Sequence, residues 1–168
     1  MARFALDQNF PQPIVEAVVE FVPEVELVPL AEIDPLLTAE MDDWEVLLAL
    51  HHHAEEWDGL ITNDHHILTS PRELAVLRQT NLTLVVVQSL GHDPIRATGL
   101  LFMHLEYISR ETTPELPQVW RLVARNRPGD DPWDYIVRIA RQQGRDPNLV
   151  WKDSRLTAAE LAQDPLTL

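Results

Sequence analysis

The sequence predicts an α/β fold in which helices cover a central parallel sheet. Its 168 residues, 45% of them hydrophobic and 24% charged, are typical of a globular protein with roughly one domain. Over residues 3–109, short apolar runs alternate with runs whose apolar residues recur at helical spacing. The absence of cysteine excludes a disulfide framework, a zinc ribbon and a thiol nucleophile. Because alternating strands and helices pack as parallel strands joined by crossover helices, we expect that architecture here.

A strand, a helix and a second strand come first along the chain. Residues 3–6 are apolar without a helical period, which predicts a buried strand. Pro13 suits the first turn of a helix, the apolar residues of 14–22 recur at helical spacing, and Pro23 ends the pattern. Residues 25–30 alternate weakly and are rich in β-branched side chains, so they predict the second strand, followed by an acidic loop.

A second helix and a very short strand follow that acidic loop. Asp42 or Asp43 is a suitable N-cap for a helix that continues to about Glu56. The acidic residues at its start favour the helix dipole. After a turn, residues 60–62 predict a strand, and residues 63–66 predict the polar loop that ends it.

The remaining elements continue the alternation and then become less regular. Ser70 and the proline after it predict a helix to about Gln79, and residues 82–87 predict a strand buried on both faces. A helix is expected over residues 94–109. The later predictions are a strand at 119–123 and helices at 132–141 and 157–160.

These elements suggest one α/β domain with an appendage. We expect residues 1–110 to form the domain and residues 111–168 to form a C-terminal extension packed on it, with a proline-containing linker at 112–117. Fewer than about 60 residues bury too little surface to form more than a marginal core alone.

Charge and hydropathy argue against two classes of protein, those that coat nucleic acid non-specifically and those that span a membrane. Asp and Glu number 27 against 13 Lys and Arg, a net charge of −14, which argues against non-specific coating of nucleic acid. Residues 1–110 hold 18 acids and 5 bases (−13), whereas residues 111–168 hold 9 acids and 8 bases (−1). The longest apolar run is far shorter than the roughly 18 residues of a membrane span, and no signal peptide is evident. We therefore expect a cytoplasmic protein with no membrane partner.

Three aspartates are expected at one edge of the sheet. Asp7 directly follows the first strand, Asp64 follows the strand at 60–62, and Asp43 starts the helix leading into that strand. Ligands of parallel sheets bind at the carboxyl ends of the strands. Carboxylates crowded there repel one another, so the cluster needs a cation, a proton or distance, and oxygen ligands without sulfur favour Mg²⁺ or Mn²⁺. The cluster predicts hydrolysis of a phosphodiester.

Three segments resemble the signature segments of PIN-domain ribonucleases: residues 4–11 (FALDQNFP), 43–47 (DWEVL) and 59–66 (GLITNDHH). The likeness covers about residues 3–105 and is greatest to the small PIN-like branch whose first segment is Asp-Glu-Asn-hydrophobic-Pro. It implies a PIN-like three-layer α/β/α sandwich that cleaves RNA with Mg²⁺ or Mn²⁺. The residues it implies are Asp7, Asp43 and Asp64 as metal-binding and catalytic carboxylates, with Asn9, Thr62 and His66 orienting the acids or the substrate.

The resemblance also implies partners. Many members of this branch are toxins of bacterial toxin–antitoxin pairs, so we expect RNA as substrate, an antitoxin protein as a partner, and a homodimer as a further assembly. A cationic antitoxin segment would be attracted to the charge of −13 over residues 1–110.

Two positions depart from the family pattern. Gln8 stands where the branch usually has Glu, and the usual Asp-x-Asp after the strand is Asp64-His65-His66 here. A neutral imidazole at His66 can bind Mn²⁺ or contact phosphate, but it suits Mg²⁺ poorly. A second hypothesis is therefore a PIN-like domain with an impaired metal site that serves as a non-catalytic protein- or RNA-interaction module.

Other interpretations stay open beside these two. Asp43 can be a helix N-cap, and Asp7 and Asp64 can form Asx turns. A phospho-receiver domain also places aspartates at strand ends, but it needs a late Lys, and residues 1–110 contain none. The residues of the His51–His53 run diverge by ~100° per position in a helix, which argues against a dedicated zinc site there.

Overall fold

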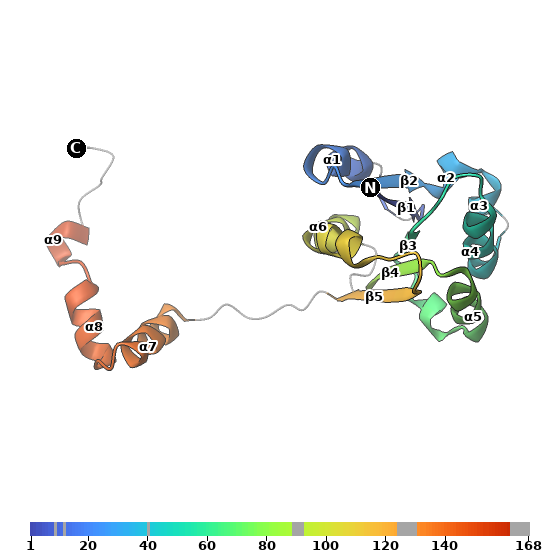
Figure 1. Ribbon diagram of the computed structural model, residues 1–168. Coiled ribbons are helices and arrows are strands. Elements are labelled where there is room, and N and C mark those ends of the chain that lie inside the picture. Colours follow the sequence, from blue (N-terminus) through green and yellow to red (C-terminus); the bar gives the residue numbers. More distant parts are fainter. Residues whose placement is uncertain (9, 12, 40, 89–92, 124–130, 162–168) are drawn as a thin grey trace. The chain divides into compact units, whose positions relative to one another are not determined.

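The computed structural model describes all residues except 9, 12, 40, 89–92, 124–130 and 162–168 (Figure 1). The chain forms two compact units, Met1–Arg125 and Asn126–Leu168. The first unit extends past the boundary predicted at residue 110. The reason is that strand β5 (Gln118–Val123) pairs with β4 (Thr83–Gln88) and so completes the sheet.

The sheet has five parallel strands in the order β2-β1-β3-β4-β5, which confirms the predicted fold class. The other strands are β1 (Ala2–Leu6), β2 (Val25–Pro29) and β3 (Gly59–Thr62). From β1 the chain first adds β2 on one side and then β3, β4 and β5 on the other. The strand order therefore reverses between β1 and β3, and parallel sheets bind ligands at such a point, beyond the carboxyl ends of the strands.

Helices cover both faces of this sheet, so the first unit is a three-layer α/β/α sandwich. Figure 1 shows α1 (Pro13–Phe21) and α6 (Pro94–Glu111) on one face, and α4 (Asp43–His52) and α5 (Pro71–Thr80) on the other. Successive strand side chains enter different cores: Phe4 and Leu6 pack with α1 and α6, whereas Ala5 packs with α4 and α5. None of the described helices is long and apolar enough to cross a membrane.

Most predicted elements are present, and the differences lie in the connections. The predicted acidic loop after β2 contains two short helices, α2 (Leu30–Ile33) and α3 (Leu36–Ala39), because Leu30 and Leu37 are buried in the second core. The predicted polar loop after β3 contains the 3₁₀ helix η1 (His65–Thr69), which buries Ile67. Helix α4 ends at His52 rather than near Glu56, because His53 is extended.

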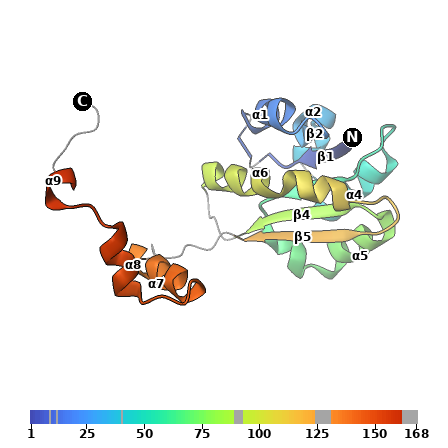
Figure 2. The same cartoon turned by 60° about the vertical axis from the view of Figure 1, so that its left-hand side comes forward.

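The second unit contains helices α7 (Pro132–Gln142), α8 (Pro147–Ser154) and α9 (Ala158–Leu161), visible in Figure 2. Helix α8 was not predicted, although Asp146 and Pro147 are a recognisable helix start: the Asp146 carboxylate accepts a hydrogen bond from the Asn148 N–H (2.8 Å). Among its described side chains, Ala140 and Val150 are buried. So little burial indicates a small helical element with a minimal core of its own.

Candidate functional site

The candidate site lies where β1 and β3 end side by side. Asp7 follows the last residue of β1, and its backbone N–H donates to the carbonyl oxygen of Ile61 in β3 (2.9 Å). Thr62, the last residue of β3, is 4% exposed. This pairing holds the Asp7 backbone against β3 and brings its side chain to the carboxyl edge of the sheet.

A chain of hydrogen bonds connects the first and third predicted segments. The Thr62 hydroxyl donates to Asp7 Oδ2 (2.7 Å) and accepts from the backbone N–H of Asp64 (3.0 Å). One Asp64 carboxylate oxygen accepts from the backbone N–H of His66 (2.8 Å). Thr62 therefore joins the Asp7 carboxylate to the Asp64 backbone, as expected for a residue that orients acids.

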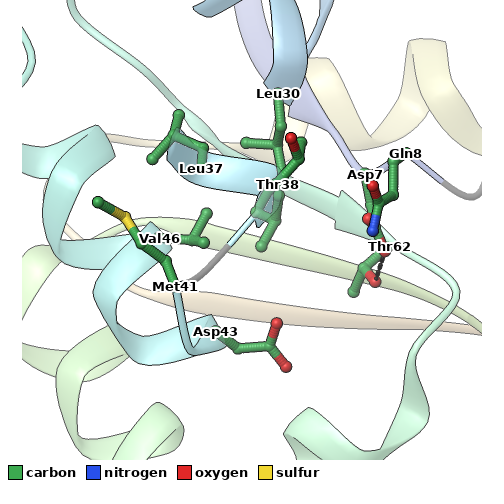
Figure 3. A pocket seen from close by; sticks show the side chains of 10 residues that line it. Asp7, Gln8, Leu30, Leu37, Thr38, Met41, Asp43, Val46 and Thr62 are labelled. Carbon is green, nitrogen blue, oxygen red and sulfur yellow. Dashed lines mark hydrogen bonds between the residues drawn. The ribbon is translucent and has the colours of Figure 1, made fainter. Parts of the chain in front are cut away.

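Asp7 and Asp43 line one small cavity of about 90 Å³ with Thr62 (Figure 3). The same figure shows Gln8 beside Asp7, with Met41 and Thr38 across the cavity. The cavity is lined by Asp7, Gln8, Leu30, Leu37, Thr38, Met41, Asp43, Val46, Leu60 and Thr62. A polar edge with carboxylates thus meets an apolar wall from α2, α3 and α4.

Asp43 does not cap helix α4. Asp42, not Asp43, is the N-cap: its carbonyl oxygen accepts from the Val46 N–H (3.1 Å), and its own N–H donates to Glu45 Oε2 (2.9 Å). Asp43 is the first helical residue and faces the cavity (Figure 3). The N-cap interpretation of Asp43 is therefore wrong, whereas Asp64 does cap η1 through its bond to His66.

The Asp43 carboxyl is partly buried and lies within electrostatic reach of other acids. Burial is the largest cause that raises the pKa of the Asp43 carboxyl above its ordinary value. Neighbouring carboxylates raise this pKa further, and in decreasing order of effect they are Asp64, Asp7, Glu73 and Asp42. Asp7 and Asp64 therefore both lie within electrostatic reach of Asp43.

Glu73 is a fourth acid that the sequence analysis did not assign to the site. It lies in the first turn of α5, and its Oε2 is buried without a hydrogen-bond partner among the described residues. Glu73 stands three residues after Ser70, which is the spacing of a capping box. The Ser70 side chain, however, makes no capping hydrogen bond. The sequence did contain a signal for Glu73: it lies in the first turn of a helix that was predicted to start shortly after Asp64, near the carboxyl edge of the sheet.

Imidazoles lie beside these acids. Asp64, His65 and His66 each offer a ligand atom, and the three atoms lie within 4.8 Å of one another. Both rings are exposed and stack at 4.5 Å between centroids. This group can hold a divalent ion that accepts nitrogen ligands, such as Mn²⁺, better than Mg²⁺. His51 and His52 are exposed at the other end of α4 and form no part of the site.

The structure thus brings Asp7, Asp43 and Thr62 to one cavity, with Asp64 close by, and Asn9 lies outside the described residues. His66 contacts Asp64 through its backbone N–H, and its exposed ring offers a nitrogen within 4.8 Å of an Asp64 carboxylate oxygen. No protein-family model matches this chain, and neither a curated protein nor a solved structure matches it. Inference about function therefore depends on this geometry.

Proposed function

We propose that this chain is a metal-dependent endoribonuclease with a PIN-like fold. The observation that carries the proposal is the convergence of Asp7, Asp43 and Asp64 at the point where the strand order reverses, where burial first and the neighbouring acids second raise the pKa of Asp43. Each ionised carboxylate gathered in this way raises the free energy of the others, and a bound cation would offset that repulsion. The three-segment resemblance to PIN-domain ribonucleases supports the same activity.

The donor set fits Mg²⁺ or Mn²⁺. Asp7, Asp43 and Asp64 would supply carboxylate oxygens, which both ions accept, and the buried Oε2 of Glu73 is a further acceptor without a described partner. When bound, the ion would supply an activated water and neutralise charge on a phosphodiester oxygen. The chain contains no cysteine, so no thiolate competes with these oxygens for a softer cation.

The chain's own residues have distinct roles in this proposal. Thr62 fixes one Asp7 oxygen through its hydroxyl, so the carboxylate is oriented before any ligand arrives. The partial burial of Asp43 lowers the local dielectric, which strengthens its attraction to a cation as well as its repulsion from other acids. The apolar wall of the cavity keeps bulk water from one side of the carboxylates.

Calorimetric titration of Mn²⁺ and Mg²⁺ tests this proposal. We expect the wild type to bind at least one of these ions and the double variant Asp7→Asn/Asp64→Asn to lose that binding. The matched control is Glu20→Gln/Glu24→Gln, which removes two exposed acids away from the site. A fluorescent RNA oligomer incubated with the metal-loaded wild type should be cut internally. Retention of metal binding by the first variant, or an intact RNA, would contradict the proposal.

An antitoxin is the proposed protein partner. The charge of −13 over residues 1–110 would favour a basic segment that covers the acidic cavity. Copurification of a small basic protein from the native host, with inhibition of RNA cleavage, would support this. Expression of active protein alone without toxicity would argue against it.

A non-catalytic interaction module is the second candidate function. The observation that favours it is Gln8, whose amide borders the cavity where the related branch usually has an acid. An amide brings no negative charge to offset that of a cation. If Gln8→Glu gains metal binding that the wild type lacks, the natural chain is the impaired module rather than the nuclease.

A further inference from the structure

Arg72 lies in the first turn of α5, the same turn that carries Glu73. Its guanidinium lies over the Trp44 ring, with 4.5 Å between the Arg72 Cζ and the ring centroid. Trp44 follows Asp43 in α4, and Arg72 precedes Glu73 in α5. Trp44 and Arg72 lie in the first turns of α4 and α5, which pack on the same face of the sheet (Figure 1), so their contact joins the two helix ends that also carry Asp43 and Glu73.

Most other arginines of residues 1–110 are neutralised by ion pairs. Arg3 pairs with Glu26 and Glu55, at 3.0 and 2.7 Å. Arg96 pairs with Asp93, and Arg110 with Glu106. Within the part of the chain that the structure describes, neither Arg72 nor Arg78 has a carboxylate partner. Arg72 is therefore an unpaired cation although Asp43 and Glu73 lie nearby in an acidic unit.

Stacking leaves the hydrogen-bonding capacity of Arg72 intact. A guanidinium that lies over an aromatic ring uses its flat face, whereas its N–H donors lie in the guanidinium plane and point outward. Those donors match the spacing of two oxygens on a phosphate. Arg72 is exposed, so the donors face solvent rather than a protein acceptor.

We propose that Arg72 binds a backbone phosphate of single-stranded RNA next to the phosphate that occupies the acidic site. The inference rests on the proposed ribonuclease function. A polyanion that approaches a unit with 18 acids and 5 bases over residues 1–110 needs a local cation as well as the metal. The cavity of about 90 Å³ is small, so it would take a phosphate group rather than a whole nucleotide. Trp44 is the positioning residue, because its ring holds the guanidinium in place.

The test measures RNA affinity and its salt dependence by fluorescence anisotropy with a fluorescein-labelled oligouridine RNA. The full chain carries Asp7→Asn/Asp64→Asn as background, so that the RNA stays intact; this variant also removes two of the negative charges that the metal would otherwise offset. Arg72→Ala, Arg72→Lys and Trp44→Leu are compared with Arg78→Ala, which removes an exposed arginine from the last turn of the same helix. Thermal unfolding followed by circular dichroism verifies that each variant folds.

The expected result is specific to one arginine. Arg72→Ala should weaken binding roughly tenfold and reduce the slope of log K against log[salt] by about 0.7, the value for one phosphate on a single strand. Arg78→Ala should stay within about twofold with the slope unchanged. Arg72→Lys should keep the slope and lose part of the affinity, and Trp44→Leu should weaken binding without adding to the effect of Arg72→Ala.

Three results would overturn this inference: equal losses for Arg72→Ala and Arg78→Ala, an unchanged salt slope in Arg72→Ala, or no RNA binding by the background protein. RNA cleavage by the metal-loaded wild type is measured separately. A specific Arg72 effect without cleavage would contradict the nuclease and leave the phosphate site standing. Cleavage without an Arg72 effect would contradict the phosphate site alone.

Discussion

At the scale of single residues, the site contains carboxylates that repel one another and a hydroxyl group that holds one of them in place. Ionised Asp43 is unfavourable, since burial and the charges of Asp64 and Asp7 raise its pKa. Thr62 positions the neighbouring groups, since its hydroxyl donates to the Asp7 carboxylate and accepts from the Asp64 backbone N–H. Both features are expected where ligand binding, rather than stability, has determined the side chains.

Asp43→Asn should stabilise the metal-free protein at neutral pH by roughly 0.5–2 kcal/mol while it weakens metal binding. A carboxyl whose pKa is raised on folding binds protons more tightly in the native state, so stability falls as pH rises above its ordinary pKa of 3.8 and through the raised value. The gain should therefore shrink toward acidic pH, where Asp43 is protonated in the wild type. Urea unfolding at several pH values measures this, with exposed Glu56→Gln as control. An equal gain at all pH values would contradict it.

Thr62→Val should destabilise the protein by roughly 1–3 kcal/mol, because the Asp64 N–H loses its acceptor. Affinity for Mn²⁺ should also fall, on the order of tenfold, because Asp7 loses the hydroxyl that orients it. Thr62→Ser keeps the hydroxyl and should retain most of the affinity. Urea unfolding and calorimetry measure the two effects. Equal Mn²⁺ affinities for the Val and Ser variants would exclude the orienting role.

At the scale of secondary-structure elements, the close approach of β3 and β4 places the third segment of the site. Gly59 begins β3, where a Cβ atom would lie 1.9 Å from the carbonyl oxygen of Thr83 in β4. Only glycine permits this approach, and the strand continues directly to Thr62. The packing of two backbones therefore determines where Thr62 and Asp64 lie.

Gly59→Ala should destabilise the protein by roughly 2–4 kcal/mol, since backbone atoms must move to admit the methyl group. Gly99→Ala is the matched control: it lies in α6, and nothing is within 4 Å of the added Cβ. This second variant should be stabilising by about 0.5–1 kcal/mol through helix propensity. Denaturant unfolding of both variants measures the difference, and similar stabilities would contradict the close approach.

The sequence predicted elements best where a periodic pattern coincided with a stop signal. Helix α1 begins at the predicted Pro13 and ends at Phe21, two residues before Pro23. Helices α2 and α3 were missed because four residues are too few to show a helical period; burial of Leu30 and Leu37 in the second core stabilises them. Glu73 was missed as a site residue because only the packing of α5 against α4 brings it within electrostatic reach of Asp43.

At the scale of the whole molecule, metal binding and folding should be coupled. A cation that binds the acidic site of the native state offsets the repulsion that the fold creates there. The second unit contributes none of the residues that line the cavity. Metal-dependent stability should therefore report on the sheet unit.

Saturating Mn²⁺ should raise the unfolding free energy by about 2.7 kcal/mol at one hundred times its dissociation constant. That gain corresponds to a rise in melting temperature of roughly 5–10 °C for a chain of this size. Calorimetric melting with and without Mn²⁺ measures it, and Asp7→Asn/Asp64→Asn should show no rise. A rise of the same size in that variant would locate the stabilising ion elsewhere.

The sequence by itself determined the alternation of strands and helices, the parallel sheet, and the placement of Asp7 and Asp64 after two strands. These properties follow from local periodicity and from the rule that parallel strands end at one edge. Only the tertiary structure decided that β5 belongs to the sheet, that Asp42 caps α4 while Asp43 faces the cavity, that Glu73 lies within electrostatic reach of Asp43, and that Arg72 lies over Trp44. The physical reason is that these contacts join residues far apart in the sequence, and helix packing forms them.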